Sequence, residues 1–351
     1  MAANSGNGAQ ASRRLGHLDA LRGIAAVSVM IYHYTTRYGE HWGHPEELVL
    51  TFPDGGMGVE LFFCISGFVI YMTLKRCRSV QEFALKRCAR LYPAYWFAVA
   101  LTFTVVSVFG LEGFEASAST ALLNLTMLNR FMRVEFVDHV YWSLTIELIF
   151  YFWMAVALHR GMLDRLHRTC LVWLAVSTIP TFLEFAFGGP NIPDILKAIL
   201  LTKYWTYFMT GMLLFRVYET GRWDWRDPAL IALGLLSLFL VAELRYVLLG
   251  TGAVSLFAIT VFGAPRFLQT RVLVFLGSIS YALYLVHQNI GYVIIRSAYG
   301  WGLGSHTAVA LAVVSAVAIA SAVTFWVEIP ARKRLTAMIP RWLERNSSAA
   351  A

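Results

Sequence analysis

The chain of 351 residues is 58% hydrophobic and only 14% charged, with a net charge of +8. A soluble domain carries about 25% charged residues, so this composition excludes an ordinary water-soluble protein. A membrane-spanning helix needs about 20 apolar residues, which leaves room for about ten spans and for no separate soluble domain. Basic cytosolic loops explain the positive charge, and no nucleic-acid partner is predicted.

Ten apolar runs follow one another along the chain and predict an all-α, polytopic membrane helix bundle of about ten transmembrane helices. We predict one membrane domain at 16–339, flanked by disordered segments at 1–15 and 340–351. The polar first fifteen residues lack the pattern of a cleavable signal peptide. The runs lie at approximately 18–36, 57–75, 93–110, 139–158, 169–187, 195–216, 229–247, 249–264, 272–294 and 307–327.

The distribution of Lys and Arg gives these runs an orientation. If the chain crosses the membrane at every run, 22 of its 29 Lys and Arg fall on the side of both termini and seven on the other side. Short cytosolic loops carry the excess of basic residues. Both termini are therefore predicted to be cytosolic.

The first run carries Arg22 and, eleven residues later, His33. Eleven helical steps of about 100° place both side chains on one face, about 16 Å apart along the axis. If Arg22 lies at the cytosolic boundary, His33 lies near the middle of a hydrocarbon core about 30 Å thick. Ionisable groups at that depth are costly and usually functional, although an interfacial Arg and a packing His would give the same pattern.

The fourth run carries Glu147 about 12 Å inward from its outer end, close to the depth predicted for His33. Ser143, Glu147 and Tyr151 recur every four residues and therefore form one polar stripe. The carboxylate is a candidate to orient the imidazole of His33. It could equally join two helices without a chemical role.

The ninth run carries a second polar stripe at helical spacing. Its depth places His287 toward the outer face. The stripe either lines a pocket for an acceptor or anchors the helix at the interface. The residues predicted for such a pocket are Ser143, Tyr281, Tyr284 and His287. It consists of Ser280, Tyr281, Tyr284, His287 and Gln288.

Arg87 and Arg90 lie three residues apart, so their guanidinium groups lie on one side of a helical turn. The forked guanidinium groups of arginine bind phosphate oxygens well. Both lie at the predicted cytosolic mouth, where a phosphorylated donor would arrive. Ordinary cytosolic charge, or contact with anionic lipid, would also explain them.

The cysteines predict neither a disulfide nor a metal site, because their spacing fits no metal-binding pattern. No other cluster predicts a metal. Packing or reduced free thiols account for all four, which are Cys64, Cys77, Cys88 and Cys170.

Five segments together resemble the acyltransferase 3 family. They occur in the family's order between residues 18 and 287, and although each is weak alone, the ordered set is specific. A looser match to the closing motif lies at 325–330. The five are Leu18–Ala26 followed by His33, Leu61–Phe68, Arg87–Pro93, Trp142–Glu147 and Leu276–His287.

This resemblance implies a ten-helix acyltransferase of the inner membrane, with acetyl-CoA as the acyl donor and no metal. The implied acceptor is a hydroxyl of a surface polysaccharide, an exopolysaccharide or a lipid-linked glycan. Arg22 and His33 correspond to the family's Arg-x10-His motif, and Arg87 and Arg90 to its donor-side arginines. Ala20 and Ile329 depart from the usual pattern at positions without a proposed catalytic group. The family often carries a fused hydrolase-like domain, and this sequence reads as a version without one.

We therefore predict His33, Glu147 and Arg22 as catalytic residues, with His33 as general base or transient acyl carrier. A proton-coupled transporter is the alternative, because buried His, Glu and Arg also form proton relays. That alternative predicts inverted repeats and broken helices, neither of which is recognisable in the sequence.

Overall fold

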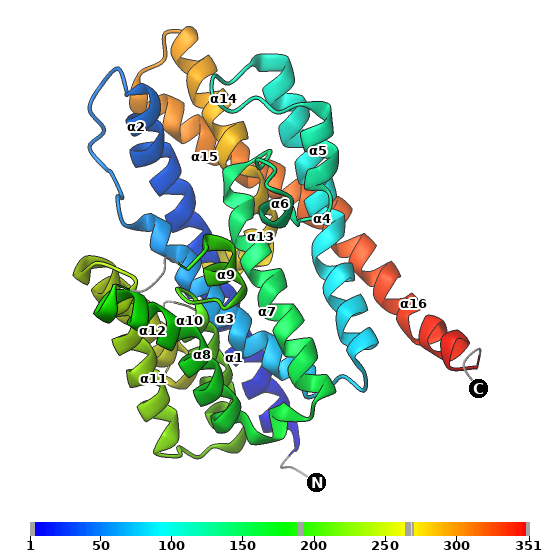
Figure 1. Ribbon diagram of the computed structural model, residues 1–351. Coiled ribbons are helices and arrows are strands. Elements are labelled where there is room, and N and C mark those ends of the chain that lie inside the picture. The colour runs from blue at the N-terminus through cyan, green and yellow to red at the C-terminus, as the bar shows by residue number, and fades with distance from the viewer. Residues whose placement is uncertain (1–3, 189–191, 264–267, 269, 349–351) are drawn as a thin grey trace. The chain divides into compact units, whose positions relative to one another are not determined.

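The computed structural model describes residues 4–188, 192–263, 268 and 270–348. Within these ranges the chain is helical and contains no strand (Figure 1), which confirms the predicted all-α class. Its helices gather into two compact units. The first consists of residues 1–25, 57–80 and 146–277, and the second of residues 26–56, 81–145 and 278–351. The predicted domain limits at 16 and 339 stay predictions.

The first unit has its densest packing between α3 and α10. Gly67 on α3 faces the carbonyl oxygen of Phe208, and Gly211 on α10 faces that of Cys64, with no room for a Cβ at either glycine. Small residues let membrane helices approach this closely. The unit contains α3 (Gly58–Leu74), α8 (Leu166–Phe187), α9 (Asp194–Ile199), α10 (Trp205–Thr220), α11 (Arg226–Ser237), α12 (Leu244–Gly263), the start of α1 (Asn4–Tyr32) and most of α7 (Trp142–His159).

This contact predicts that Gly211→Leu strongly destabilises the protein. The new side chain would meet the backbone of α3, which cannot move aside without separating the two helices, and overpacking typically costs about 1–3 kcal/mol. The midpoint of thermal unfolding in detergent should fall. Gly252→Leu is the matched control, because a Cβ at Gly252 on α12 meets nothing within 4 Å. Equal midpoints for the two variants would contradict the proposed close contact.

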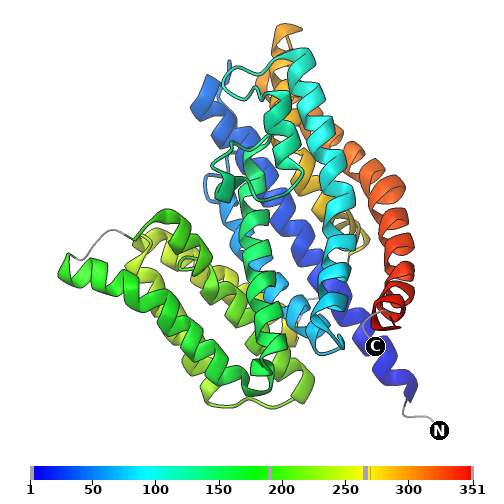
Figure 2. The ribbon, with the colours of Figure 1, turned by 45° about the vertical axis from the view of Figure 1, so that its right-hand side comes forward.

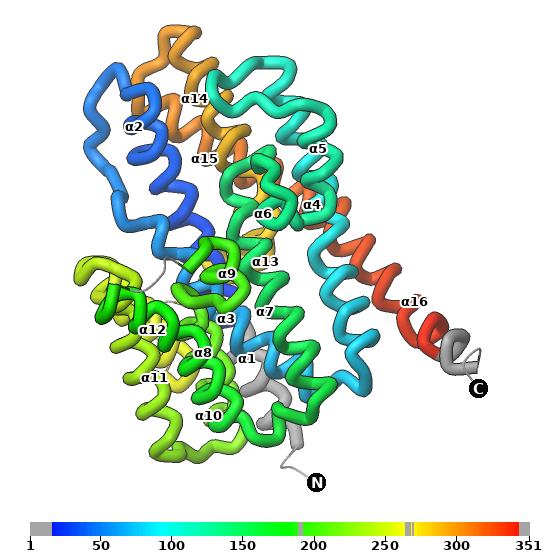
Figure 3. Tube along the Cα trace, viewed as in Figure 1, coloured from blue at the N-terminus to red at the C-terminus, as the bar shows by residue number. Residues whose placement is uncertain are grey.

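The second unit contains a helix that breaks inside the apolar region. Helix α13 (Arg271–Val286) and α14 (Gln288–Gly300) meet at His287 with a bend of 76°, and the path through this break can be followed in Figure 3. Helix α14 then packs along α15. The unit's other helices are α2 (Tyr38–Trp42), α4 (Val80–Phe109), α5 (Ala118–Asn124), α6 (Asn129–Met132), α15 (Ser305–Ala322) and α16 (Ile329–Ser348).

Six described helical segments are long and apolar enough to cross a membrane, and the bent pair α13 and α14 makes a seventh if counted as one span. Three of the ten predicted runs take another form. Run 195–216 is divided between α9 and α10, and run 229–247 is divided between α11 and the start of α12 by a short 3₁₀ turn, Leu238–Leu240. Run 18–36 covers the end of α1 and a π-helical turn. The chain is thus a multi-pass helical protein, with fewer clear spans than predicted.

Candidate active site

His33 opens a π-helical turn, His33–Arg37, at the end of α1. Such turns widen a helix by one residue and are frequent at functional sites. Nδ1 of His33 lies 2.9 Å from the carbonyl oxygen of Val29 and 3.0 Å from Nε2 of His287. The two imidazoles are therefore direct neighbours, although 254 residues separate them in sequence.

The partners of these rings assign the protons of the neutral pair. Nδ1 of His287 lies 2.9 Å from the carbonyl oxygen of Tyr284 and 3.1 Å from that of Leu283, and carbonyl oxygens only accept. His287 therefore carries its proton on Nδ1 and accepts at Nε2. Nδ1 of His33 faces this acceptor and the carbonyl oxygen of Val29, so it must donate. Neutral His33 keeps its free lone pair on Nε2, the nitrogen that can take a proton or attack an acyl group.

The break at His287 is held by side chains from other parts of the second unit. The hydroxyl of Tyr34 donates to the carbonyl oxygen of His287 at 2.6 Å, and that of Tyr141 to the carbonyl oxygen of Leu285 at 3.2 Å. The buried carboxylate of Asp138 accepts from the backbone N–H of Asn289 at 3.1 Å. A broken helix in a membrane needs such partners, because unsatisfied backbone groups are costly there. They hold the imidazole of His287 against His33.

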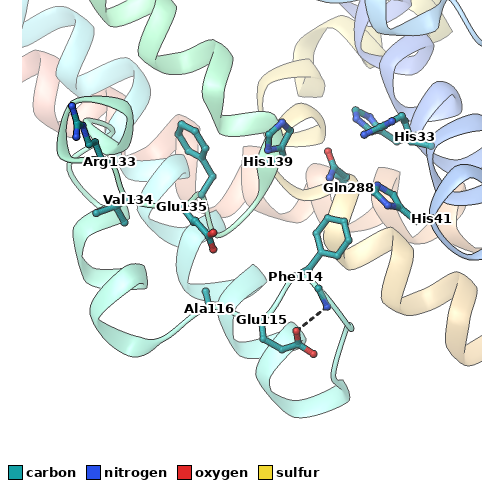
Figure 4. Close-up of a pocket in the computed structure, with 13 residues that line it drawn as sticks. His33, His41, Phe114, Glu115, Ala116, Arg133, Val134, Glu135, His139 and Gln288 are labelled. Atoms are coloured by element: carbon teal, nitrogen blue, oxygen red, sulfur yellow. Dashed lines mark hydrogen bonds between the residues drawn. The ribbon is translucent and has the colours of Figure 1, made fainter. Parts of the chain in front are cut away.

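A cavity of about 610 Å³ opens beside this pair (Figure 4). His33 and Gln288 line it from the helix ends, and His139 and Phe114 from the connection between α4 and α7. His41 lies at its rim, where partial burial and the nearby Arg37 lower the pKa of the imidazole. Arg37, Arg133, Glu115 and Glu135 add both signs of charge. A cavity with mixed polar groups and an aromatic ring has the chemistry to hold a hydroxyl-rich ligand.

Arg90 is held by an ion pair with Glu328, whose side chain is only 3% exposed. Its guanidinium carbon also lies 4.9 Å from the centre of the Tyr281 ring, and the Tyr281 hydroxyl donates to the carbonyl oxygen of Leu91 at 2.9 Å. Arg87 lies over the ring of Phe83. Tyr281 thus lies beside Arg90, away from the residues that line the cavity. Sequence reasoning missed Glu328, although a carboxylate in an apolar run was the signal that could have found it.

Glu147 and Arg22 belong to the first unit. The Glu147 carboxylate accepts hydrogen bonds from Ser66 at 2.7 Å and from Tyr151 at 2.6 Å. Ser66 belongs to the motif at 61–68, so two of the family-like motifs meet here. Arg22 forms an ion pair with Asp19 at 3.1 Å. His33 has His287 as its side-chain partner, and the expected proximity of Glu147 to His33 stays a prediction.

Ser143 and Tyr284 connect α7 to α13. Their hydroxyls lie 2.8 Å apart, and each lies within hydrogen-bond distance of the carbonyl oxygen of Val140, so one hydroxyl donates to that carbonyl and the other donates to its hydroxyl neighbour. Both side chains are buried, and neither lines the cavity. Their predicted place in an acceptor pocket stays a prediction. Of the four residues predicted for that pocket, His287 is the one that contacts His33.

The comparison with known proteins identifies the family of the chain. A family model described as an acyltransferase domain matches residues 15–327, which include all five motifs. The chain belongs to the acyltransferase 3 family. As a member of this family it is a membrane acyltransferase, and its His33 and His287 each lie in a motif of the family-like pattern.

Two curated relatives are similar to the chain at low identity. The chain is 25% identical over 346 residues to the O-acetyltransferase OatA of Staphylococcus aureus, a match that covers 83% of this chain and 52% of OatA. It thus spans about half of that relative. It is 24% identical over 351 residues to the acyltransferase MdmB of Streptomyces mycarofaciens, with 88% of each chain covered. No solved structure matches the chain significantly.

Proposed function

We propose that this enzyme transfers an acetyl group from cytosolic acetyl-CoA to a hydroxyl of a cell-surface polysaccharide, an exopolysaccharide or a lipid-linked glycan. It does so in the inner (cytoplasmic) membrane, through a domain of ten spans with both termini in the cytosol. The observation that carries the proposal is the His33–His287 pair at the cavity, which leaves one basic nitrogen for a ligand. The similarity to an O-acetyltransferase supports oxygen as the acceptor atom.

In the second unit, the proposed donor site and the cavity lie toward opposite ends of α4. This arrangement fits a donor and an acceptor that arrive from opposite sides of the membrane. Arg87 and Arg90 lie near the start of α4, whereas the cavity gathers residues beyond the far end of the same helix (Figure 1). The arginines would hold the phosphates of acetyl-CoA, and the glycan would enter the cavity. We also propose catalytic roles for Arg22 and Glu147.

Nε2 of His33 takes the proton of the acceptor hydroxyl as its oxygen attacks the thioester carbonyl. The carbon–sulfur bond then breaks, and the leaving thiolate of CoA receives the proton from Nε2. During this cycle Nδ1–H of His33 continues to donate to His287 and Val29, which stabilises the imidazolium. If His33 instead attacks the thioester itself, the same nitrogen carries the acetyl group. Rapid quenching with radiolabelled acetyl-CoA separates the two routes, because only the second labels the protein.

The proposal is tested with the purified enzyme in liposomes that contain a candidate glycan acceptor. Radiolabelled acetyl-CoA should yield an acetylated glycan whose label is released by mild alkali, as expected of an oxygen ester. In cells, deletion of the gene should remove O-acetyl groups from the surface glycan, and the intact gene should restore them. Radiolabelled acetyl groups that are transferred only to water and not to the glycan would refute the proposed function. Surface O-acetylation that persists without the gene would refute it as well.

The broken helix at His287 is a feature that the alternative reading, a proton-coupled transporter, also predicts. The sequence alone did not reveal this break. In the acyltransferase reading the break has a direct role, because it presents His287 to His33. The liposome assay separates the two readings, since a transporter would move solute with a pH gradient and form no ester.

Donor binding should depend on the two arginines of α4. Arg87→Ala should weaken binding of acetyl-CoA by about 1.5–3 kcal/mol, the typical contribution of a charge-assisted contact. Arg90→Ala should weaken it similarly, but it also leaves the buried carboxylate of Glu328 with only the more distant Arg332, at 3.8 Å, and should lower protein abundance. Calorimetry with acetyl-CoA gives the affinity.

Combining Arg90→Leu with Glu328→Gln separates these two effects of Arg90. The combined variant should regain abundance and still bind the donor weakly. Arg76→Ala, an exposed charge of the neighbouring loop, is the matched control. Normal affinity for acetyl-CoA in both arginine variants would show that Arg87 and Arg90 do not bind the donor and only help to orient the chain in the membrane.

The proposed orientation predicts the location of the C-terminus. A reporter that is active only outside the cytosol, fused after Ala351, should give no signal, because the charge distribution places both termini inside. The same reporter inserted after Gly113, in the connection that borders the cavity, should be active. An active C-terminal fusion would show that one span has been miscounted, most readily at 229–264.

A further inference from the structure

A second cavity of about 740 Å³ lies between α4 and α16, both in the second unit. The two helices stand next to each other in Figure 2. Cys88, Tyr92 and Trp96 line the cavity from α4, and Met338, Arg341 and Trp342 line it from α16. Around α4, Cys88 lies about 200° from Arg90 and Pro93 about 60° from it, and neither Arg87 nor Arg90 is among the residues that line the groove.

The groove is apolar and open rather than filled by protein. The side chain of Trp96 is 50% exposed, that of Met338 61% and that of Trp342 47%. Three large apolar side chains exposed at one opening would be unfavourable in water and would promote aggregation. In a bilayer they face hydrocarbon, and a groove of this size falls within the range of about 300–1,000 Å³ found for ligand pockets.

Polarity changes along the groove. Helix α4 rises from Val80 while α16 descends to Ser348, so the two helices run in opposite directions (Figure 1). Cys88, early on α4, and Arg341, late on α16, therefore belong to one end of the groove, and Trp96 belongs to the other. Among the residues that line the groove, Arg341 is the one that carries a charge, and Trp342 follows it directly. One end is therefore cationic with an indole beside it, and the other is apolar. A Trp next to basic residues is typical of the lipid headgroup level.

We propose that this groove is a binding site for one anionic phospholipid. Its phosphate lies at Arg341, within the positive potential of α16, and one acyl chain follows Tyr92, Trp96 and Met338 toward the membrane interior. Charge complementarity selects the anionic headgroup, since basic segments attract anionic lipids by about 1 kcal/mol for each Lys or Arg near the surface. The site lies apart from the proposed donor arginines and does not depend on the identity of the acyl acceptor.

The first test is native mass spectrometry of the full-length protein after exchange into equimolar phosphatidylglycerol and phosphatidylcholine. One phosphatidylglycerol should be retained in preference to phosphatidylcholine. Arg341→Ala should reduce this preference about fivefold, the equivalent of about 1 kcal/mol. Met338→Trp should fill the groove and reduce retention of both lipids. Arg226→Ala is the matched control, because it removes an exposed arginine that pairs with Asp224 in the first unit.

The rate at which Cys88 is alkylated tests whether the lipid lies in this groove. It is exposed and lines the groove, whereas Cys64 and Cys170 are buried. In a Cys77→Ser background, phosphatidylglycerol should slow alkylation of Cys88 by a maleimide, and phosphatidylcholine should not. Equal retention of both lipids would overturn the proposal in favour of ordinary boundary lipid. Displacement of phosphatidylglycerol by acetyl-CoA, or a dimer whose formation protects Cys88, would overturn it in favour of another occupant.

Discussion

His33→Ala should abolish acyl transfer while leaving the protein in the membrane at normal abundance. General acid–base catalysis contributes about 10²–10⁴-fold, and a nucleophilic role would add to that figure. Nε2 of His33 is the nitrogen that the hydrogen-bond network leaves for a ligand, since Nδ1 is held by Val29 and His287. Alanine is easier to bury than histidine, so insertion should not suffer. The measurement is O-acetyl content of the surface glycan, scored with membrane abundance.

Two comparisons keep the His33 result interpretable. His159→Ala, at the exposed end of α7, should behave as wild type and controls for the loss of a histidine. Added imidazole should restore part of the activity of His33→Ala, because the cavity of about 610 Å³ has room for it beside the vacated position. Near-normal acetylation by an abundant His33→Ala protein would remove His33 from the mechanism and reopen the transporter reading.

His287→Leu should lower kcat by about 10²–10⁴-fold with little change in KM for acetyl-CoA. The loss of the group that accepts from a catalytic imidazole costs up to about 10⁴-fold. Without Nε2 of His287, the proton of His33 is shared only with the carbonyl oxygen of Val29, and the imidazolium loses its stabilising partner. His287 is thus a positioning residue, which acts through His33 and not on the donor.

His287→Gln provides the conservative arm of this experiment. A glutamine amide offers both a donor for the carbonyls of Leu283 and Tyr284 and an acceptor for His33, so part of kcat should return. A purely structural role for His287 predicts a different pattern, in which both variants lose abundance and the surviving molecules keep wild-type kcat. Equal kcat per folded molecule in wild type and His287→Leu would remove the pair from the mechanism.

The sequence by itself determined the class of protein and the residues worth examining. Low charge and long apolar runs require a helical membrane protein, because backbone polar groups in lipid are satisfied locally only by helices. The cost of burying ionisable groups singled out His33, Glu147 and the arginines. Five ordered motifs indicated the acyltransferase 3 family, which the family match confirmed.

Only the tertiary structure decided how these residues combine. Hydropathy reports the composition of a run and not its continuity, so the run at 272–294 concealed the bend at His287. Pairing depends on which helices become neighbours, and periodicity within one helix carries no such information. For this reason periodicity could not reveal that His287 contacts His33, or that Glu147 accepts hydrogen bonds from Ser66 and Tyr151. The predicted proximity of Glu147 to His33 stays a prediction.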